Sequence, residues 1–186
     1  MIPLTVRSAY SLGWGVSGLE SLCRHAKKLG YDRLALTDTD NLYGLWPFLA
    51  ACKREDIRPI VGAEVTDKDT PARAICLVKN NRGYSQLCRL LTRRHTRADF
   101  ELKTALKQFS EGLVVLTTSP DLLCAGHDAG IDIAAALPRK PVPAAHPIRE
   151  TARRLGLPVV ATPGSYFNHA DDFAIHRVLR AIDKNT

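Results

Sequence analysis

The sequence predicts an α/β fold in which seven short strands alternate with amphipathic helices and form a closed or nearly closed β/α barrel. Apolar runs that are too short for helices and lack polar alternation are typical of buried parallel strands. Apolar residues at helical spacing follow most of these runs. Capping residues separate the two patterns most clearly at 37–40, directly after the apolar run at 34–36. A doubly wound open sheet is the alternative fold.

The first two strand and helix pairs come from residues 3–54. Residues 3–8 alternate apolar and polar, which predicts a first strand. Ser17 and Glu20 have capping-box spacing and Gly30 supplies a left-handed stop, so we expect a helix between them. The run at 34–36 is the second strand. A helix over 41–54 follows, and because Pro47 falls in its first turns we expect a kink or a late start.

The rest of the chain continues the alternation. Too few residues link the strands expected at 57–65 and 74–78 for a crossover helix, which predicts a hairpin. The elements expected after this hairpin are helices over 83–91 and near 102–109, a strand over 113–117, a short helix opened by Ser119 and Pro120, a strand over 131–136, an extended proline-rich loop over 138–147, a helix from Pro147 to Gly156, a strand over 157–162 and a helix capped by Asp171 and Asp172.

Composition limits the kind of protein. With 186 residues, 45% of them hydrophobic, the chain can form one sizeable domain, which we expect to span 1–186. It contains no apolar run of 18 residues and opens directly into a strand pattern. We therefore expect neither a membrane span nor a signal peptide, and a cytoplasmic location.

The five cysteines are odd in number, lack CxxC spacing and lie among apolar residues. This pattern favours reduced thiols in the core over a disulfide framework or a zinc site.

The formal net charge of +7 favours an anionic partner. Basic residues cluster at Arg89, Arg93, Arg94 and Arg97, which we take as candidate nucleic-acid contacts. A solvated helix face is the alternative explanation for such a run. Few aromatic residues accompany the cluster, so base stacking has little support.

Several blocks of sequence resemble one family when taken together. They occur in the family's order and cover nearly the whole chain: 4–12, 35–44, 58–65, 83–90, 112–116 and 157–162. The chain resembles the polymerase and histidinol phosphatase (PHP) domain, in the form found at the amino terminus of bacterial DNA polymerase III alpha subunits and their error-prone paralogues. The resemblance implies a distorted, TIM-like barrel of seven strands. It also implies that the chain is the amino-terminal fragment of a longer DNA-directed DNA polymerase, in which a downstream domain performs nucleotidyl transfer.

The resemblance also directs attention to a metal site. Active PHP domains hold two or three Zn, Mn or Mg ions, mainly through histidines and carboxylates at the strand ends. Asp38 and Glu64 keep acidic residues at two of these positions. At the remaining ligand positions of the family, this chain has other residues in place of the histidines. The positions of this chain that match the family's metal site are Thr5, Arg7, Asp38, Thr39, Glu64, Gly164 and Ser165.

Two carboxylates cannot assemble a cluster that needs several donors, and Arg7 places a permanent cation where a ligand should be. We therefore expect a degenerate site that binds no metal and performs no catalysis. One hypothesis is that Arg7 replaces the lost metal charge and pairs with Glu64 or Asp38. The alternative is that Arg7 points into solvent and that both acids are hydrated.

The leading interpretation is thus a structural and docking domain of a polymerase that serves replication or repair synthesis. Its expected partners are the remainder of the polymerase chain, a proofreading exonuclease subunit and DNA. One alternative is a metal-dependent phosphoesterase or 3′–5′ exonuclease, and another is a free-standing nucleic-acid-binding module. The sequence does not separate a replicative from an error-prone parent.

Overall fold

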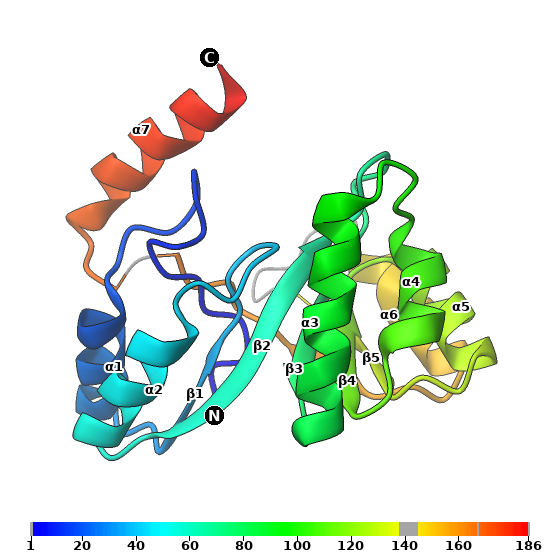
Figure 1. The fold of residues 1–186 in the computed structure, drawn as a ribbon, viewed down its shortest axis with the longest axis horizontal. Helices are drawn as coiled ribbons and strands as arrows, with labels where there is room; N and C mark the ends of the chain where they lie inside the picture. Colours follow the sequence, from blue (N-terminus) through cyan, green and yellow to red (C-terminus); the bar gives the residue numbers. More distant parts are fainter. Residues whose placement is uncertain (1, 138–144, 167, 186) are drawn as a thin grey trace. The chain divides into compact units, whose positions relative to one another are not determined.

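A computed structural model describes residues 2–137, 145–166 and 168–185 and shows a mixed α/β fold (Figure 1). Its strands follow one another in the sheet in the order β1-β2-β3-β4-β5-β6. The described helices and strands are α1 (Leu19–Lys28), β1 (Arg33–Leu36), α2 (Leu45–Arg54), β2 (Arg58–Thr66), β3 (Arg73–Val78), α3 (Asn81–Thr96), α4 (Leu102–Phe109), β4 (Leu113–Thr117), α5 (Pro120–Asp128), β5 (Ile133–Leu137), α6 (Ala145–Arg154), β6 (Val159–Ala161) and α7 (Asp172–Lys184).

The chain divides into two compact units, and β2 passes from one to the other. The first unit comprises residues 1–61 and 164–186, and the second comprises 62–163. The prediction of a single domain over 1–186 stays a prediction.

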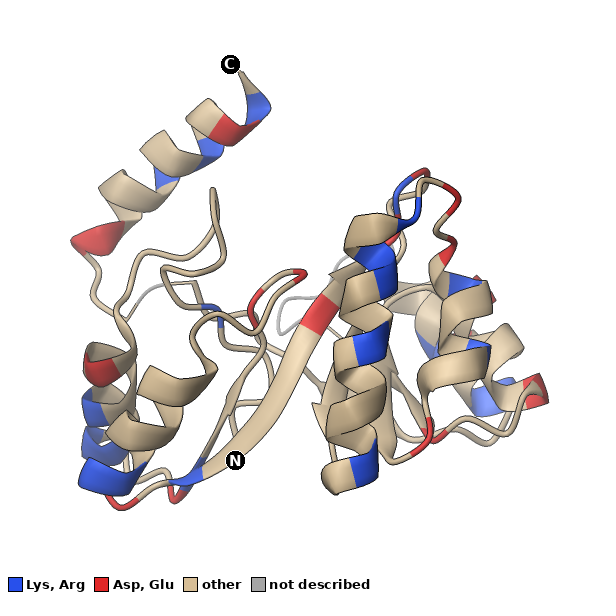
Figure 2. Cartoon of the chain, in the orientation of Figure 1, with Lys and Arg blue, Asp and Glu red and all other residues tan. Residues whose placement is uncertain are grey.

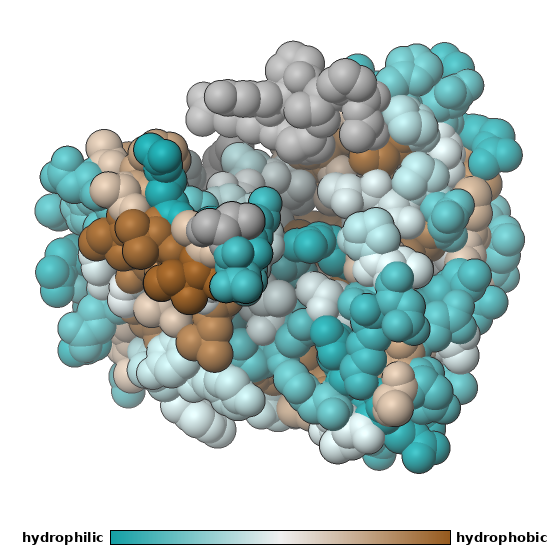
Figure 3. All heavy atoms as spheres, turned by 90° about the horizontal axis from the view of Figure 1, so that it is seen from above, coloured by the Kyte–Doolittle hydropathy of each residue, from teal (hydrophilic) through white to brown (hydrophobic). Residues whose placement is uncertain are grey.

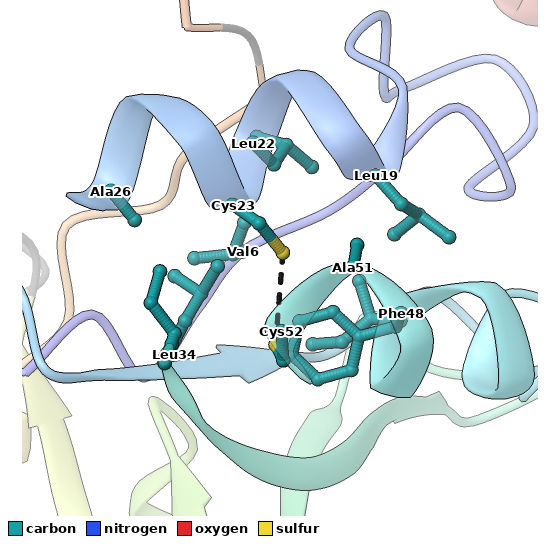
Figure 4. Packing of buried hydrophobic residues seen from close by; sticks show 11 residues of the cluster. Val6, Leu19, Leu22, Cys23, Ala26, Leu34, Phe48, Ala51 and Cys52 are labelled. Carbon is teal, nitrogen blue, oxygen red and sulfur yellow. Dashed lines mark hydrogen bonds between the residues drawn. The ribbon is translucent and has the colours of Figure 1, made fainter. Parts of the chain in front are cut away.

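In the first unit, β1 pairs in parallel with Arg58–Val61 of β2. Helices α1 and α2 supply most of an apolar cluster that also contains residues of β1 (Figure 4). The late start expected from Pro47 is confirmed, because α2 begins at Leu45, so that the missing N–H of the proline falls in the first turn. Gly30 has the expected positive φ, of 77°, just after α1.

Two predictions for the first unit are wrong. Residues 3–8 form no strand beyond a single bridge between Val6 and Ser165. Ser17 does not cap α1, because its hydroxyl donates to Asn168 Oδ1 at 2.7 Å instead. The described residues therefore contain six strands, and the seven-stranded barrel is not shown.

In the second unit, the predicted hairpin is confirmed. Gly62–Thr66 pairs antiparallel with β3, and β3 pairs antiparallel with β4. β4, β5 and β6 then pair in parallel. In sequence, α3 and α4 lie between β3 and β4, α5 between β4 and β5, and α6 between β5 and β6. Ser119 accepts a hydrogen bond from the Leu122 N–H, as expected for the cap of α5. Most of the predicted proline-rich loop, at 138–144, lies outside the described residues.

The five cysteines are free thiols, and Cys23, Cys52 and Cys76 lie in the core as expected, whereas Cys88 and Cys124 are half-buried. Cys23 of α1 and Cys52 of α2 are fully buried, and their sulfur atoms lie 3.6 Å apart (Figure 4). This hydrogen bond lowers the pKa of the Cys23 thiol and raises that of Cys52. Burial raises the pKa of Cys76 to about 12. Cys23, Cys52 and Cys76 are therefore core residues, and Cys23 is the more acidic member of its pair.

Over the part of the chain that the structure describes, no helix has the length and apolar character needed to span a membrane.

Candidate functional site

The first unit brings together most of the predicted metal-site positions. Ser165 N–H donates to the Thr5 carbonyl at 2.9 Å, and Arg7 N–H donates to the Ser165 carbonyl at 3.0 Å. Thr37 N–H, at the end of β1, donates to the Val6 carbonyl at 2.8 Å. These bonds place Thr5, Arg7 and Ser165 beside the carboxyl end of β1, from which Asp38 and Thr39 follow. The structure thus brings these positions together at the end of β1 within this unit.

Asp38 is the centre of a buried hydrogen-bond network. Its side chain is 1% exposed. Oδ1 accepts from Ser8 N–H at 2.7 Å and from the Ser11 hydroxyl at 2.6 Å, and Oδ2 accepts from the Ser8 hydroxyl at 2.8 Å. Both carboxylate oxygens are therefore bound by donors from the loop that follows Arg7. Sequence analysis missed both serines, because nothing in Ser-Ala-Tyr-Ser at 8–11 links them to a carboxylate about 30 residues away.

The Ser11 hydroxyl also accepts from Thr39 N–H at 3.1 Å. The turn after β1 is thus tied to the loop at 8–11 through a single serine. The loop is held from its other end as well, because Gly15 N–H donates to the Ser11 carbonyl at 2.9 Å. A Cβ at Gly15 would lie 1.8 Å from the Ser8 carbonyl oxygen, so the backbone approaches there too closely for any other residue.

Arg7 is 5% exposed and lies among aromatic rings. Its guanidinium carbon is 4.8 Å from the Tyr166 ring centroid and 5.7 Å from that of Trp14. Arg180 of α7 also lies over Trp14, at 3.5 Å from the ring centroid. Cations over aromatic faces are stabilised most when they are desolvated, as Arg7 is here. The alternative in which Arg7 points into solvent is wrong.

Glu64 belongs to β2 in the second unit. Its side chain is 3% exposed, and its Oε1 lies 3.5 Å from Arg73 Nη1. Both Glu64 and Asp38 are buried, so the expectation that these acids are simply hydrated is wrong. The predicted pairing of Arg7 with one of them stays a prediction.

The second unit also has a surface pocket of about 440 Å³ beside the end of β4. Asp67, Ser119 and Asp121 are among its lining residues. Burial opposes ionisation of Asp67, but hydrogen bonds from Leu102 N–H and from the turn at 69–70 outweigh it and hold the pKa of this carboxyl below its usual range. The Leu102 bond, at 2.6 Å, fixes the start of α4. Asp67 is thus a structural carboxylate.

Among residues 2–137, 145–166 and 168–185, no group of three or more His, Cys, Asp or Glu side chains is placed to hold a metal ion. Comparison with known protein families matches residues 3–157 to the PHP domain. The chain belongs to the PHP domain family. The resemblance seen in the sequence is thereby confirmed.

The curated relatives of this PHP domain are polymerases. It is 27% identical to the DNA polymerase III subunit alpha of Chlamydia pneumoniae over 96% of this chain and 19% of that protein. It is 35% identical to the same subunit of Bacillus subtilis over 62% of this chain and 11% of that protein. An error-prone DNA polymerase of Anaeromyxobacter sp. strain K is 40% identical over 50% of this chain and 8% of its own length. The chain thus spans about a fifth or less of these relatives.

Solved structures show the same fold. A candidate metal-dependent phosphoesterase of Bifidobacterium adolescentis superposes with a TM-score of 0.63 at 14% identity, covering 90% of this chain and 88% of that one. An amidohydrolase of Chromobacterium violaceum superposes with a TM-score of 0.64 at 14% identity, covering 89% of this chain and 87% of that one. At this identity the likeness shows the fold alone.

Proposed function

We propose that this chain is a PHP module of a DNA polymerase III alpha-like protein in replication or repair synthesis, that its metal site is degenerate, and that it has a structural and docking role. The observation that carries the proposal is the network around Asp38. The carboxylate at the family's metal-ligand position is bound by Ser8 and Ser11 through both of its oxygens. The family's seven-stranded barrel is part of the proposal, supported by the likeness to solved PHP-like structures.

The donor set at this site does not fit metal-assisted phosphoester hydrolysis. That chemistry needs ions about 3.5–4 Å apart, each bound by several nitrogen and oxygen ligands. Thr5, Arg7 and Thr39 stand where the family has histidines, and a guanidinium both lacks a lone pair for a metal and repels it. Glu64 lies against Arg73, so this acid has a cationic neighbour. We infer that the buried Arg7 cation supplies positive charge that metal ions supply in active relatives.

The docking role is supported by α7, which is oriented with its polar side toward its own unit. His176 Nδ1 lies 2.7 Å from the Trp14 carbonyl oxygen, and Arg180 lies over the Trp14 ring. The opposite side carries exposed apolar residues, with Ile175 53%, Val178 59% and Ile182 71% exposed. Hydrophobic residues gather on the surface over α7 (Figure 3). A stripe at this helical spacing is typical of an interface.

We propose that the remainder of the polymerase chain covers this stripe. The curated relatives extend far beyond the matched segment, which leaves polypeptide of the same chain as the nearest partner. A proofreading exonuclease subunit is a second proposed partner of the module, and the expected location is the cytoplasm.

Replacing Val178 by Asp tests the docking role. We expect the free energy of unfolding of the isolated chain to change by less than about 0.5 kcal/mol, because the side chain is already exposed. Copurification with the co-expressed downstream polypeptide of the same reading frame should be lost, because a buried unpaired carboxylate is costly at an apolar contact. Arg177→Asp is the matched control, since it introduces the same residue one position away, off the stripe. Equal binding by Val178→Asp and the wild type would contradict the docking role.

The competing function is a metal-dependent phosphoesterase, favoured by the fold of the Bifidobacterium structure. Such an enzyme would hold metal ions stoichiometrically and release phosphate from nucleotides in their presence. A degenerate module would do neither.

A further inference from the structure

We propose that the exposed arginines along α3 form a binding surface for the phosphate backbone of a nucleic acid. This proposal does not depend on the loss of the metal site or on the docking role of α7. The surface consists of Arg89, Arg93 and Arg97, and we call it the α3 arginine row. It lies within the second unit.

Charge is concentrated on this segment. Residues 82–107 contain seven Lys and Arg against two Asp and Glu, so they account for +5 of the net charge of +7. Basic residues follow the length of α3 and continue on α4 (Figure 2). Arg89 and Arg93 are one helical turn apart, and Arg97 follows one turn later at the end of α3. All three side chains are exposed.

The structure changes the set of contacts that the sequence suggested. Arg94 is half-buried, and its Nε and Nη2 donate to the Thr66 carbonyl and hydroxyl at 2.7 and 3.0 Å. Its guanidinium carbon lies 5.9 Å from the Phe100 ring centroid. Arg94 therefore fastens α3 to β2, and we leave it out of the surface. Arg82 is also left out, because it forms an ion pair with Glu111 at 2.5 Å.

Arg93 is held in position without being buried. Its guanidinium carbon lies 5.3 Å from the Phe109 ring centroid, and Nη1 donates to Gln108 Oε1 at 3.4 Å. A braced arginine loses less side-chain entropy when it binds phosphate. Arg93 and Arg97 also line a surface pocket of about 150 Å³ that includes Asp99 and Glu101. These two acids make that end of the row less favourable for phosphate than the Arg89 end.

The dimensions suit a nucleic acid. At 1.5 Å rise per residue, the eight-residue step from Arg89 to Arg97 covers about 12 Å. A DNA duplex carries about seven phosphate charges over that length. No exposed aromatic side chain lies between the three arginines in sequence, so the contact would be made to the backbone and would be independent of base sequence.

An anionic membrane is the competing anionic partner, and the burial of α3 argues against it. Membrane-surface helices insert an apolar face beside their basic residues. The leucines of α3 are instead committed to the core, with Leu87 and Leu90 0% and Leu91 7% exposed.

The test measures binding of the 186-residue chain to a fluorescein-labelled 20-nucleotide single strand and to the matching 20-base-pair duplex. Fluorescence anisotropy is recorded between 25 and 200 mM NaCl for the wild type and for the triple variant Arg89→Gln, Arg93→Gln, Arg97→Gln. We expect the triple variant to bind the duplex at least tenfold more weakly at the lowest salt concentration. The slope of log K against log salt concentration should be shallower by about 2 to 3, because each neutralised phosphate contributes about 0.9.

The matched control is the triple variant Arg149→Gln, Arg153→Gln, Arg154→Gln on α6 of the same unit, which removes the same charge. We expect it to keep the wild-type salt slope. Thermal unfolding of both variants checks that they fold, and Arg94→Gln should lower the unfolding temperature while leaving the slope unchanged. Equal losses in the two triple variants, no DNA binding by the wild type at 25 mM NaCl, or tighter binding to anionic lipid vesicles than to DNA would each overturn the proposal.

Discussion

Replacing Asp38 by Asn should lower the free energy of unfolding of this chain by about 3 kcal/mol. The carboxylate is buried and accepts three hydrogen bonds, from Ser8 N–H and from the hydroxyls of Ser8 and Ser11. An amide of the same shape places an NH₂ group toward donors, so at least one donor loses its acceptor inside the protein. Hydrogen bonds to charged groups contribute more than neutral ones, which makes the expected loss large. Urea unfolding at pH 7 measures it.

Asp32→Asn is the matched control in the same unit. Asp32 is exposed and pairs with Arg58 at the surface, so its substitution should cost less than about 1 kcal/mol. EDTA should leave the wild-type midpoint unchanged, because Ser8 and Ser11 already donate to both carboxylate oxygens of Asp38. A small effect of Asp38→Asn, or a wild-type midpoint that falls on chelation, would contradict the structural role of this carboxylate.

Replacing Gly15 by Ala should destabilise the chain by about 3 kcal/mol. The new methyl group would lie 1.8 Å from the Ser8 carbonyl oxygen and 2.5 Å from its carbon, both of them backbone atoms that cannot rotate away. The loop would have to move, and Ser8 and Ser11 would move with it away from Asp38. The substitution therefore tests whether the loop and the Asp38 network form one unit, again by urea unfolding.

Gly18→Ala serves as the control, because a Cβ at Gly18 meets no atom within 4 Å. Gly18 is the N-cap of α1, where alanine is somewhat worse than glycine, so we expect a loss of about 1 kcal/mol or less. If Gly15→Ala cost no more than Gly18→Ala, the close approach of the two backbone segments would not exist in solution.

Local pattern predicts most helices and strands of this chain because each depends on its own apolar spacing. The hairpin of β2 and β3 follows from a short linker, and the late start of α2 follows from the ring of Pro47. The segment 3–8 has the alternation of a strand, yet the hydrogen bonds of its backbone are divided between residues 35–37 and residue 165, so no regular ladder forms. Which neighbours a segment meets is a property of the tertiary structure.

The contacts of the candidate site likewise depend on the tertiary structure and not on local sequence pattern. The resemblance in sequence identified Asp38 and Arg7, and the structure shows that both are buried. It could not identify Ser8 and Ser11 as partners of Asp38, since they lie 30 and 27 residues away in the chain. Ser17 shows the limit most clearly. Its spacing to Glu20 predicted a helix cap, but its hydroxyl bonds to Asn168, 151 residues away.

We propose that this chain keeps the PHP fold while the metal-binding side chains of active relatives are replaced. Elemental analysis of the purified 186-residue chain, after dialysis against Zn, Mn or Mg and then against metal-free buffer, tests this most directly. We predict far less than one ion per chain, and no phosphate release from nucleotides above the buffer blank. One or more tightly held ions per chain that disappear in Glu64→Gln, together with metal-dependent phosphate release, would contradict the claim.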